Sequence, residues 1–426
     1  MPAADGTPRV IVVGGGVAGL VAAREFVLAG REVIVLEKSD RLGGQVARHS
    51  VAGIEIDAGA EAYSTRGSDI PRLLTALGLA GDVVTPAPSP AWVMRSRGGA
   101  VPLPATSLLG IPAVPLAQDV IDAIGLPAAL RAQLDMLMPG LVGAKAETVG
   151  ELVRRRMGRG VLEGLVAPVT RGVHSADPDS LELDRAAPGL RGALLSMGNL
   201  GQAVASLRAK APAGSLVASL RGGMFRLVDA LTADLERFGV QVRTGVAVTA
   251  YDAAGATTDA GERIRGEVLI AAPLDVDAPR TRVQVATIAV DAPALSDAPR
   301  GTGVLVAPGV AGVSARALTH LTAKWSWLAE STPLQLLRLS YDEGVEVTAE
   351  VARSDAEALL GVRIPTPVDS AVVAWERAGR RTDAQHAIDG MQRVGEAESG
   401  TGLAAVVSYA RSVAGAIPSE GSGGEG

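Results

Sequence analysis

The sequence has no cysteine among its 426 residues, and only 3% of the residues are aromatic. Without cysteine there is no disulfide framework, no thiolate-ligated metal and no dithiol redox pair. A cofactor attached through cysteine is excluded for the same reason. The four histidines are scattered, and none has the spacing of a metal ligand relative to another: they are His49, His174, His320 and His386. The sequence therefore predicts no metal site.

The lack of a long apolar run and of a positive net charge excludes further classes of protein. No run of about 18 consecutive apolar residues is present, so no membrane-spanning helix is predicted. The net charge of -6 gives no support to a nucleic-acid partner. Because an apolar run begins close to the first residue, we expect no signal peptide and a cytoplasmic location. A peripheral membrane contact stays open.

A glycine-rich turn near the start of the chain is the strongest positive signal. Val10–Val13 is typical of a buried strand, and the glycines follow it directly. Gly14 permits a tight turn, Gly16 lets the backbone approach a pyrophosphate, and Gly19 lets the next helix pack on the strand. The first N–H groups of that helix, at Val17 and Ala18, then face the phosphates.

An acid after a second strand supports the same interpretation. Val33–Leu36 is apolar, and Glu37 follows it about 20 residues after the glycines, where an acid binds the ribose hydroxyls of adenosine. Glycines alone are weak support, because they also cluster in ordinary turns. Here the strands, the helix and the acid agree, so the sequence predicts a dinucleotide-binding βαβ unit.

The residues after Glu37 indicate which dinucleotide the unit binds. Lys38 is followed shortly by Arg41-Leu42-Gly43-Gly44, and an Arg-x-Gly-Gly beyond the acid is typical of FAD proteins of the two-dinucleotide-fold type. The paired glycines permit a second close backbone approach, and Arg41 adds positive charge. If this run stood alone, a surface turn with a solvated arginine would explain it better than a cofactor contact. Further on, Gly59-Ala60-Glu61 ends a half-buried strand and is expected to return the chain toward the flavin.

Nucleotide-binding and other segments alternate along the chain. The predicted fold class is α/β: an FAD-binding Rossmann-like domain interleaved with an α+β substrate domain and a helical region. No second GxGxxG opens a βαβ unit, so a separate NAD(P)H domain is not expected. The predicted boundaries are 1–62, 214–275 and 370–418 for the FAD domain, 63–115 and 276–369 for the substrate domain, 116–213 for the helical region, and 419–426 for a disordered tail.

Motifs along the whole chain resemble those of one enzyme family. They are the glycine turn with Arg41–Gly44, a Leu103-Pro104 to Gly110-Ile111-Pro112 stretch, Pro168 to Gly172-Val173-His174 and Asp177-Pro178, Gly222-Gly223-Met224, Lys324-Trp325, and Gly395-Glu396 with Gly402-Leu403-Ala404. The family is that of the FAD-dependent protoporphyrinogen and coproporphyrinogen III oxidases of haem biosynthesis, within the flavin amine oxidase superfamily. His174 departs from the usual tyrosine of this family. The stretch between Trp375 and Gly395 is also shorter than usual.

The resemblance implies a set of cofactor contacts. The backbone of Val248, with Val246 as the less favoured alternative, is expected against the adenine. Trp375, Gly395 and Glu396 are expected near the isoalloxazine ring. Gly402, Leu403 and Ala404 begin the last helix and are expected beside the flavin.

The resemblance also implies a reaction, in which flavin N5 accepts hydride from a porphyrinogen and dioxygen reoxidises the flavin with release of hydrogen peroxide. No catalytic acid or base is required, so none is predicted. The candidate cations for the substrate propionates are Arg171 and Lys324, with Arg95 and Arg338 less favoured. A structural ion pair explains Arg171 as well, and Lys324 can extend over apolar surface. The run Arg154–Arg156 and Arg159 favours a solvated helix face.

Coproporphyrinogen III is the favoured substrate, because the chain has no plainly membrane-inserting segment and a tetracarboxylate stays in water. The alternatives are a protoporphyrinogen IX oxidase, a flavin amine oxidase, a carotenoid desaturase, or a flavin-binding protein without turnover. Few aromatics are available for the aromatic cage of an amine oxidase. Transfer of the product to a ferrochelatase also stays open.

Overall fold

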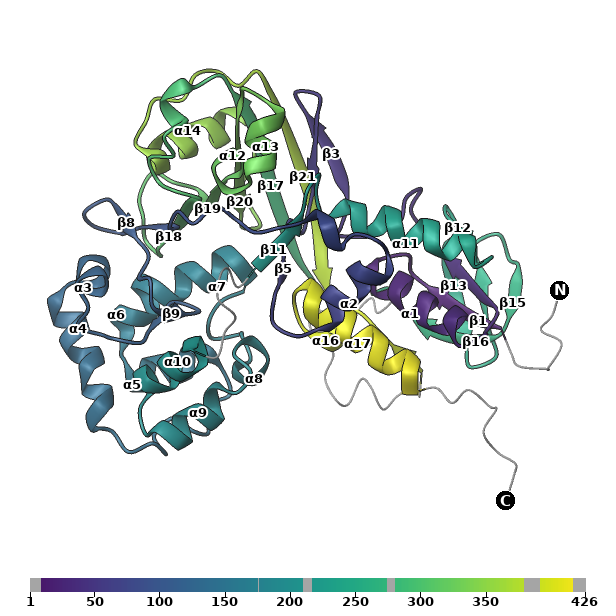
Figure 1. Cartoon of the computed structure of the whole chain (residues 1–426), viewed down its shortest axis with the longest axis horizontal. Coiled ribbons are helices and arrows are strands. Elements are labelled where there is room, and N and C mark those ends of the chain that lie inside the picture. Colours follow the sequence, from purple (N-terminus) through teal and green to yellow (C-terminus); the bar gives the residue numbers. More distant parts are fainter. Residues whose placement is uncertain (1–8, 175, 210–216, 274–279, 379–390, 417–426) are drawn as a thin grey trace.

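The computed structural model describes residues 9–174, 176–209, 217–273, 280–378 and 391–416. A parallel sheet lies toward one end of the molecule and has a hydrophobic core on each face (Figure 1). The five strands are, in spatial order, β12 (Gln241–Arg243), β2 (Val33–Leu36), β1 (Val10–Val13), β16 (Glu267–Ile270) and β22 (Gln392–Arg393). Sequence-distant strands therefore lie side by side, as an interleaved nucleotide-binding domain requires.

Alternate residues of the parallel strands serve two hydrophobic cores. Val10 and Val12 face a layer of helices, whereas Ile11 and Val13 face a three-stranded antiparallel sheet. Strands buried on both faces need continuous apolar runs, which explains the sequence of β1 and β2. The helices are α1 (Val17–Leu28), α11 (Phe225–Arg237) and α17 (Leu403–Ala416), and the antiparallel strands are β13 (Val248–Asp252), β14 (Gly255–Thr258) and β15 (Arg263–Arg265).

A larger, mainly antiparallel sheet lies beside the nucleotide-binding part (Figure 1). Its strands are, in spatial order, β21 (Asp369–Ala378), β17 (Arg280–Val290), β20 (Gln335–Tyr341), β19 (Ala315–His320), β18 (Gly303–Val306), β7 (Trp92–Met94) and β8 (Ala100–Pro102). The 310 helix η4 (Pro293–Leu295) and the helices α12 (Leu321–Lys324), α13 (Ser326–Ser331) and α14 (Ala349–Leu360) belong to the same part. The sequence pattern from Val283 to about Val362 predicts alternating strands and turns. The helices α12, α13 and α14 lie in this range and correct that prediction.

The third group of elements is helical and occupies one side of the molecule (Figure 1). It comprises α3 (Gln118–Ile124), α4 (Leu126–Gln133), η2 (Leu134–Leu137), α5 (Val149–Arg156), α6 (Arg159–Val161), the π-helical turn η3 (Leu162–Val166), α7 (Ala167–His174), α8 (Leu183–Ala186), α9 (Leu190–Met197) and α10 (Leu200–Ala209). Among the described residues, no helix combines the length and the apolar character that a membrane span needs.

The arginine run in α5 is solvated only in part. Arg154, Arg155 and Arg159 are exposed, as predicted, but Arg156 is fully buried. Its guanidinium binds the carboxylate of Asp135 and donates to the carbonyl oxygens of Pro139 and Val142, both at 3.0 Å. Burial of the charge is offset by these acceptors. Arg156 therefore fastens the loop after η2, and the expectation of a wholly solvated helix face was wrong.

Short elements join the three groups. A hairpin of β3 (Arg48–Val51) and β4 (Ile54–Asp57) lies between the parallel sheet and the large sheet. The other short elements are β5 (Tyr63–Ser64), β6 (Val83–Val84), β9 (Ser107–Leu108), β10 (Ile111–Pro112), β11 (Val217–Leu220), α2 (Asp69–Ala76), η1 (Ala80–Asp82) and α16 (Glu396–Ser399). The domain boundaries stay predictions. The tail 419–426, residues 214 and 275, and most of the shortened stretch before Gly395 lie outside the described residues.

Candidate functional site

In the glycine-rich turn, Gly14 and Gly19 pack closely against other atoms, whereas Gly16 faces open space. A Cβ on Gly14 (φ 113°) would lie 2.8 Å from the backbone of Ala271, and one on Gly19 would lie 2.1 Å from the carbonyl oxygen of Gly14. A Cβ on Gly16 would meet no atom within 4 Å. Gly16 precedes α1, which begins at Val17. The turn therefore leaves room for a ligand at a helix N-terminus, whose first N–H groups have no intrahelical acceptor.

Glu37 ends the strand beside this turn, and its carboxylate is held in place. Oε2 accepts a hydrogen bond from the N–H of Gly15 at 2.6 Å, and Oε1 accepts from the N–H and the hydroxyl of Ser39 at 2.9 and 2.5 Å. The N–H of Val246 donates to the carbonyl oxygen of Glu37 at 2.9 Å. The start of β13, with Val248, thereby lies near the acid. Lys38, between Glu37 and Ser39, is exposed.

The Arg41–Gly44 loop lies directly on the glycine turn. The N–H of Gly43 donates to the carbonyl oxygen of Gly15 at 2.8 Å, and Gly16 and Gly43 form a parallel bridge. Gly44 has a φ of 58°, and a Cβ there would lie 3.4 Å from the Cα of Gly16. Arg41 is exposed, and its Nη1 donates to the carbonyl oxygen of Gly44 at 3.0 Å. The two glycine loops therefore form one backbone cradle.

The C-terminal segment reaches the same cradle through Glu396. Its Oε2 accepts from Gln45 Nε2 at 3.0 Å, and its Oε1 accepts from Nε of Arg377 at 3.0 Å. Trp375 lies two residues before Arg377 on β21, so the two side chains share a face of that strand.

Added Cβ atoms on Gly395 and Gly402 would meet no atom within 4 Å. Leu403 and Ala404 begin α17, which packs along α1 (Figure 1).

A turn after β4 carries the second predicted flavin contact, Gly59-Ala60-Glu61. A Cβ on Gly59 would lie 1.9 Å from the carbonyl oxygen of Gln45, so the turn packs directly on the Arg41–Gln45 loop and tolerates only glycine there. Glu61 is 17% exposed, and its two carboxylate oxygens have different cations. Oε1 binds Nζ of Lys324, and Oε2 lies 3.4 Å from Nη1 of Arg338.

This ion cluster keeps Glu61 ionised. Burial alone would raise the pKa of the Glu61 carboxyl, but Lys324 and Arg338 together hold that pKa below its usual value. Two cations share one carboxylate, so these three groups carry a net positive charge. Lys324 was predicted to bind substrate carboxylates, and in the structure its ammonium binds the carboxylate of Glu61. A substrate carboxylate that binds Lys324 would share the ammonium of Lys324 with Glu61.

Asp57, four residues earlier, connects the same turn to a helix. Its carboxylate oxygens accept from the N–H groups of Met224 and Phe225 at 2.9 and 3.0 Å, which caps the N-terminus of α11. Burial raises the pKa of Asp57 to about 7, although both backbone donors oppose the shift. Gly222-Gly223-Met224, which the sequence marked only as a family motif, therefore supplies the partner of a buried carboxyl.

Arg171, the other predicted substrate cation, lies in α7. Its Nη2 is 2.6 Å from Oδ2 of Asp177, and both side chains are about half-exposed. A Cβ on Gly172 would lie 2.4 Å from the side chain of Leu305, so α7 packs tightly on β18. Arg171 is therefore in an ion pair with the Asp177 of its own motif, and it stays accessible to solvent. No contact between Arg171 and Lys324 is recorded among the described residues, and the side chain of His174 lies outside them.

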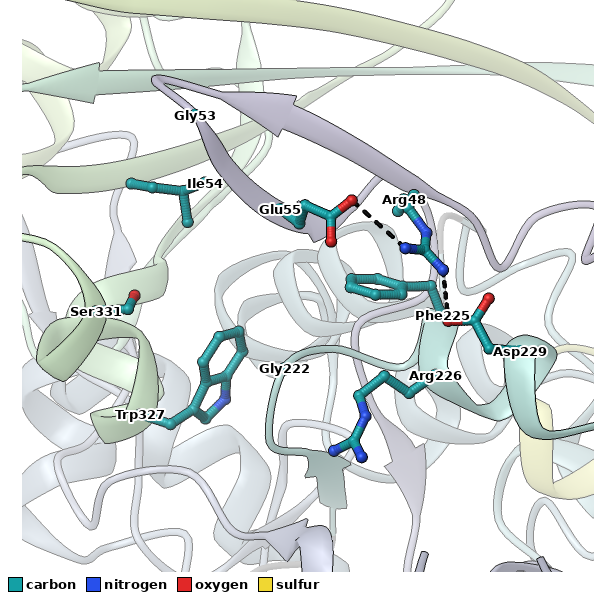
Figure 2. A pocket seen from close by; sticks show the side chains of 10 residues that line it. All are labelled: Arg48, Gly53, Ile54, Glu55, Gly222, Phe225, Arg226, Asp229, Trp327 and Ser331. Atoms are coloured by element: carbon teal, nitrogen blue, oxygen red, sulfur yellow. Dashed lines mark hydrogen bonds and ion pairs between the residues drawn. The ribbon is translucent and has the colours of Figure 1, made fainter.

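A surface pocket of about 550 Å³ lies beneath the β3–β4 hairpin (Figure 2). Arg48 spans it above the ring of Phe225 and pairs with Glu55 and Asp229, as Figure 2 shows. None of the predicted cofactor residues lines this pocket. Trp327 also borders an inner cavity of about 20 Å³ next to Asp57, Glu61 and Arg338. That cavity has room for about one water molecule.

The fold and the cradle together define a dinucleotide-binding flavoprotein of the two-dinucleotide-fold type. Open glycines at two helix N-termini, an anchored acid after β2 and the Arg41–Gly44 loop suit the pyrophosphate and ribose of FAD. Residues 17–305 match the family described as flavin containing amine oxidoreductase. FAD is accordingly the cofactor of this oxidoreductase.

Similarity to named relatives indicates the subgroup of the family to which the chain belongs. A coproporphyrinogen III oxidase of Mycobacterium bovis is 30% identical over 405 residues, which cover 87% of each chain. The coproporphyrinogen III oxidase of Propionibacterium freudenreichii subsp. freudenreichii is 27% identical over 273 residues, 56% of this chain and 52% of the relative. A mitochondrial protoporphyrinogen oxidase of Nicotiana tabacum is 27% identical over 263 residues, 56% of this chain and 50% of the relative.

The chain therefore belongs to the flavin containing amine oxidoreductase family, and within it to the coproporphyrinogen III and protoporphyrinogen oxidase group. Solved structures agree on the fold. A protein of Exiguobacterium sp. 255-15 described as a protoporphyrinogen oxidase has a TM-score of 0.79 at 23% identity, covering 96% of this chain and 98% of its own. UDP-galactopyranose mutase has a TM-score of 0.67 at 13% identity and covers 96% and 95%. The predicted fold class, family and cofactor are confirmed.

Sequence reasoning gave too little weight to three residues at this site. Arg338 was a minor candidate for substrate binding, and it is 8% exposed and binds the 57–61 turn. No role was predicted for Gln45 or Asp57. A single arginine inside the apolar strand Leu336–Leu339 was the available signal for Arg338, because an unpaired charge is not buried at such a position.

Proposed function

We propose that this chain is an FAD-dependent oxidase of porphyrin biosynthesis that converts coproporphyrinogen III into coproporphyrin III. The 30% identity to a coproporphyrinogen III oxidase across 87% of both chains carries this proposal. Bound FAD would supply the hydride acceptor, and three two-electron oxidations would remove six electrons and six protons from the porphyrinogen. Three molecules of dioxygen would take them up as hydrogen peroxide.

The roles of the cofactor residues are part of this proposal. The cradle of Gly14, Gly16, Gly43 and Gly44, with the first N–H groups of α1, would bind the pyrophosphate. Glu37 would bind the ribose and Val248 the adenine. The remaining predicted contacts would surround the isoalloxazine ring: Gly59, Ala60, Glu61, Trp375, Gly395, Glu396, Gly402, Leu403 and Ala404.

Substrate recognition would depend on cations that reach the propionates. Arg171 supports this role best, because its guanidinium is 39% exposed and its partner Asp177 is exposed too. Lys324 would contribute through the charge that it shares with Glu61. Charge-assisted hydrogen bonds are worth roughly 1.5–3 kcal/mol each, so a tetracarboxylate gains more from such cations than a dicarboxylate.

Protoporphyrinogen IX is the second candidate substrate, and the similarity to the protoporphyrinogen oxidase of Nicotiana tabacum favours it. Steady-state kcat/KM of the purified protein on both porphyrinogens decides between them. We expect a higher kcat/KM with coproporphyrinogen III. An equal or higher value with protoporphyrinogen IX would reverse the assignment of substrate within the same family. Cytoplasmic location and transfer of the product to a ferrochelatase stay predictions.

A further inference from the structure

A buried arginine of the large sheet connects that sheet to the flavin-facing turn. Arg338 is the one charged residue of β20, where it pairs in register with Thr287 of β17 and Thr319 of β19. Its neighbours Leu337 and Leu339 belong to the core under α14, so Arg338 faces the opposite side of the sheet. The residue is only 8% exposed. A guanidinium in this position must be satisfied by acceptors.

The acceptors of Arg338 are three consecutive backbone carbonyls of one turn. Nη1 donates to the carbonyl oxygen of Asp57 at 3.3 Å, and Nη2 donates to those of Ala58, at 3.2 Å, and Gly59. Nη1 also reaches the carboxylate of Glu61 at 3.4 Å. A planar guanidinium presents its donors in a fixed fork, so four contacts within five residues fix the shape of this turn.

The opposite edge of the turn is hydrogen-bonded to the irregular segment before β3. The N–H of Ala58 donates to the carbonyl oxygen of Ala47 at 2.7 Å, and that of Ala60 donates to Gln45 at 3.3 Å. In the part of the chain that the structure describes, no acceptor is recorded for the N–H of Gly59 or Glu61. A peptide group is planar, so a fixed carbonyl also fixes the direction of the next N–H. Because Arg338 holds the carbonyl of Ala58, it also orients the N–H of Gly59, which belongs to the same peptide plane.

We infer that Arg338 is a positioning residue, which holds the 57–61 turn so that the N–H of Gly59 faces the isoalloxazine ring of FAD. The inference rests on the proposed place of this turn beside the flavin, but it does not depend on which porphyrinogen is the substrate. It also assigns Arg338 to the cofactor side, because its donors are already committed to the turn. Lys324 completes the arrangement by binding the other oxygen of Glu61.

The test compares Arg338 with an arginine of the same chemistry elsewhere. Arg156 is also buried and binds one carboxylate and several carbonyls, but in the helical region. The variants are Arg338→Gln and Arg338→Lys, with Arg156→Gln and Arg156→Lys as matched controls. The readouts are the visible absorption spectrum of bound flavin, its midpoint potential, and the Kd for FAD added to apoprotein. Circular dichroism checks folding.

We expect Arg338→Gln to weaken FAD binding at least 10-fold, to shift the flavin spectrum and to lower the midpoint potential, because a positive charge is lost beside the ring. Arg338→Lys should restore the potential in part and the Kd less, since one ammonium cannot span three carbonyls. The Arg156 variants should reduce thermal stability and leave the spectrum, the potential and the Kd of FAD within twofold of wild type.

Spectra and potentials of both Arg338 variants that match those of the Arg156 variants would overturn the inference. If Arg338→Gln does not fold, the comparison of the two lysine variants decides, because lysine keeps the charge. None of these measurements uses a porphyrinogen, so inactivity toward porphyrinogens would contradict the proposed function and leave this inference standing. A wild-type protein that binds no FAD would contradict both.

Discussion

The glycine cradle and the Glu61 ion cluster lie on neighbouring segments but are built differently. The cradle consists of backbone groups from Gly14–Gly19 and Arg41–Gly44, which are close in sequence. The cluster consists of side chains from Glu61, Lys324 and Arg338, and the Glu61–Lys324 pair alone spans 263 residues. Local spacing can encode a backbone cradle, whereas only the folded chain brings a buried ion cluster together.

The two sites also respond differently to substitution. In the cradle, a side chain fails because of the space that it fills, as the Cβ distances at Gly14 and Gly19 show. In the cluster, a substitution fails because it leaves a buried charge without a partner. Steric substitutions should therefore abolish cofactor binding, and charge substitutions should change affinity, pH response and substrate preference by degrees.

The largest expected effect is that of Gly16→Asp. A carboxylate would occupy the open space before α1 and repel the pyrophosphate, so we expect FAD binding to weaken more than 100-fold. Titration of apoprotein with FAD, followed by flavin fluorescence, measures this. Gly192→Asp is the matched control, because Gly192 is exposed and also faces open space. If Gly16→Asp retains FAD as well as Gly192→Asp does, the pyrophosphate is not bound at Gly16.

Asp57 should make the stability of the fold depend on pH. The folded-state pKa is about 7, above the usual 3.8, so the folded state prefers the protonated carboxyl. The contribution of Asp57 to the free energy of unfolding should therefore be largest below about pH 4 and be lost as the pH rises to 7. The slope should approach 1.4 kcal/mol per pH unit. Chemical denaturation at several pH values measures it.

The matched variants for this prediction are Asp57→Asn and Asp229→Asn. Asp229 is an exposed residue on the same helix that Asp57 caps, and its side chain is 52% exposed. We expect Asp57→Asn to flatten the pH dependence between pH 4 and 7, and Asp229→Asn to leave it unchanged. Identical slopes in wild type and Asp57→Asn would show that Asp57 does not titrate in this range.

A smaller effect is expected at the substrate cation. Arg171→Ala should raise KM for coproporphyrinogen III about 10-fold, because one carboxylate loses a charged partner, and should change KM for protoporphyrinogen IX less. Lys324→Ala should act in the same direction. Arg154→Ala is the control for Arg171, since Arg154 is a similarly exposed arginine paired with Asp179. An unchanged KM in Arg171→Ala, with kcat also unchanged, would remove Arg171 from the substrate site.

The sequence predicted most of the nucleotide-binding part because its constraints are local. Gly14, Gly19 and Glu37 lie within one βαβ unit, and their spacing is set by the turn and the helix. The buried strands were recognisable as apolar runs for the same reason. The missed helix α14 shows where prediction from local sequence fails. Its apolar residues recur at helical spacing, but the segment lies between strands and was grouped with them.

The charged residues were harder to interpret, because their roles depend on distant partners. Lys324 was predicted to bind substrate, and the structure shows that it also pairs with Glu61. Arg156 was expected in solvent and is buried on Asp135. No local pattern distinguishes a lysine that meets a carboxylate of its own chain from one that meets a ligand. For the same reason, the cations that recognise the propionates stay proposals.

The most direct test of the proposed function is anaerobic mixing of the FAD-loaded protein with coproporphyrinogen III. We predict that the visible absorption of the bound flavin bleaches faster than with any tested amine or with NAD(P)H. Admission of air should then restore the absorption, with coproporphyrin III and hydrogen peroxide as products. Flavin that coproporphyrinogen III and protoporphyrinogen IX leave oxidised, or that NAD(P)H reduces just as fast, would contradict the account.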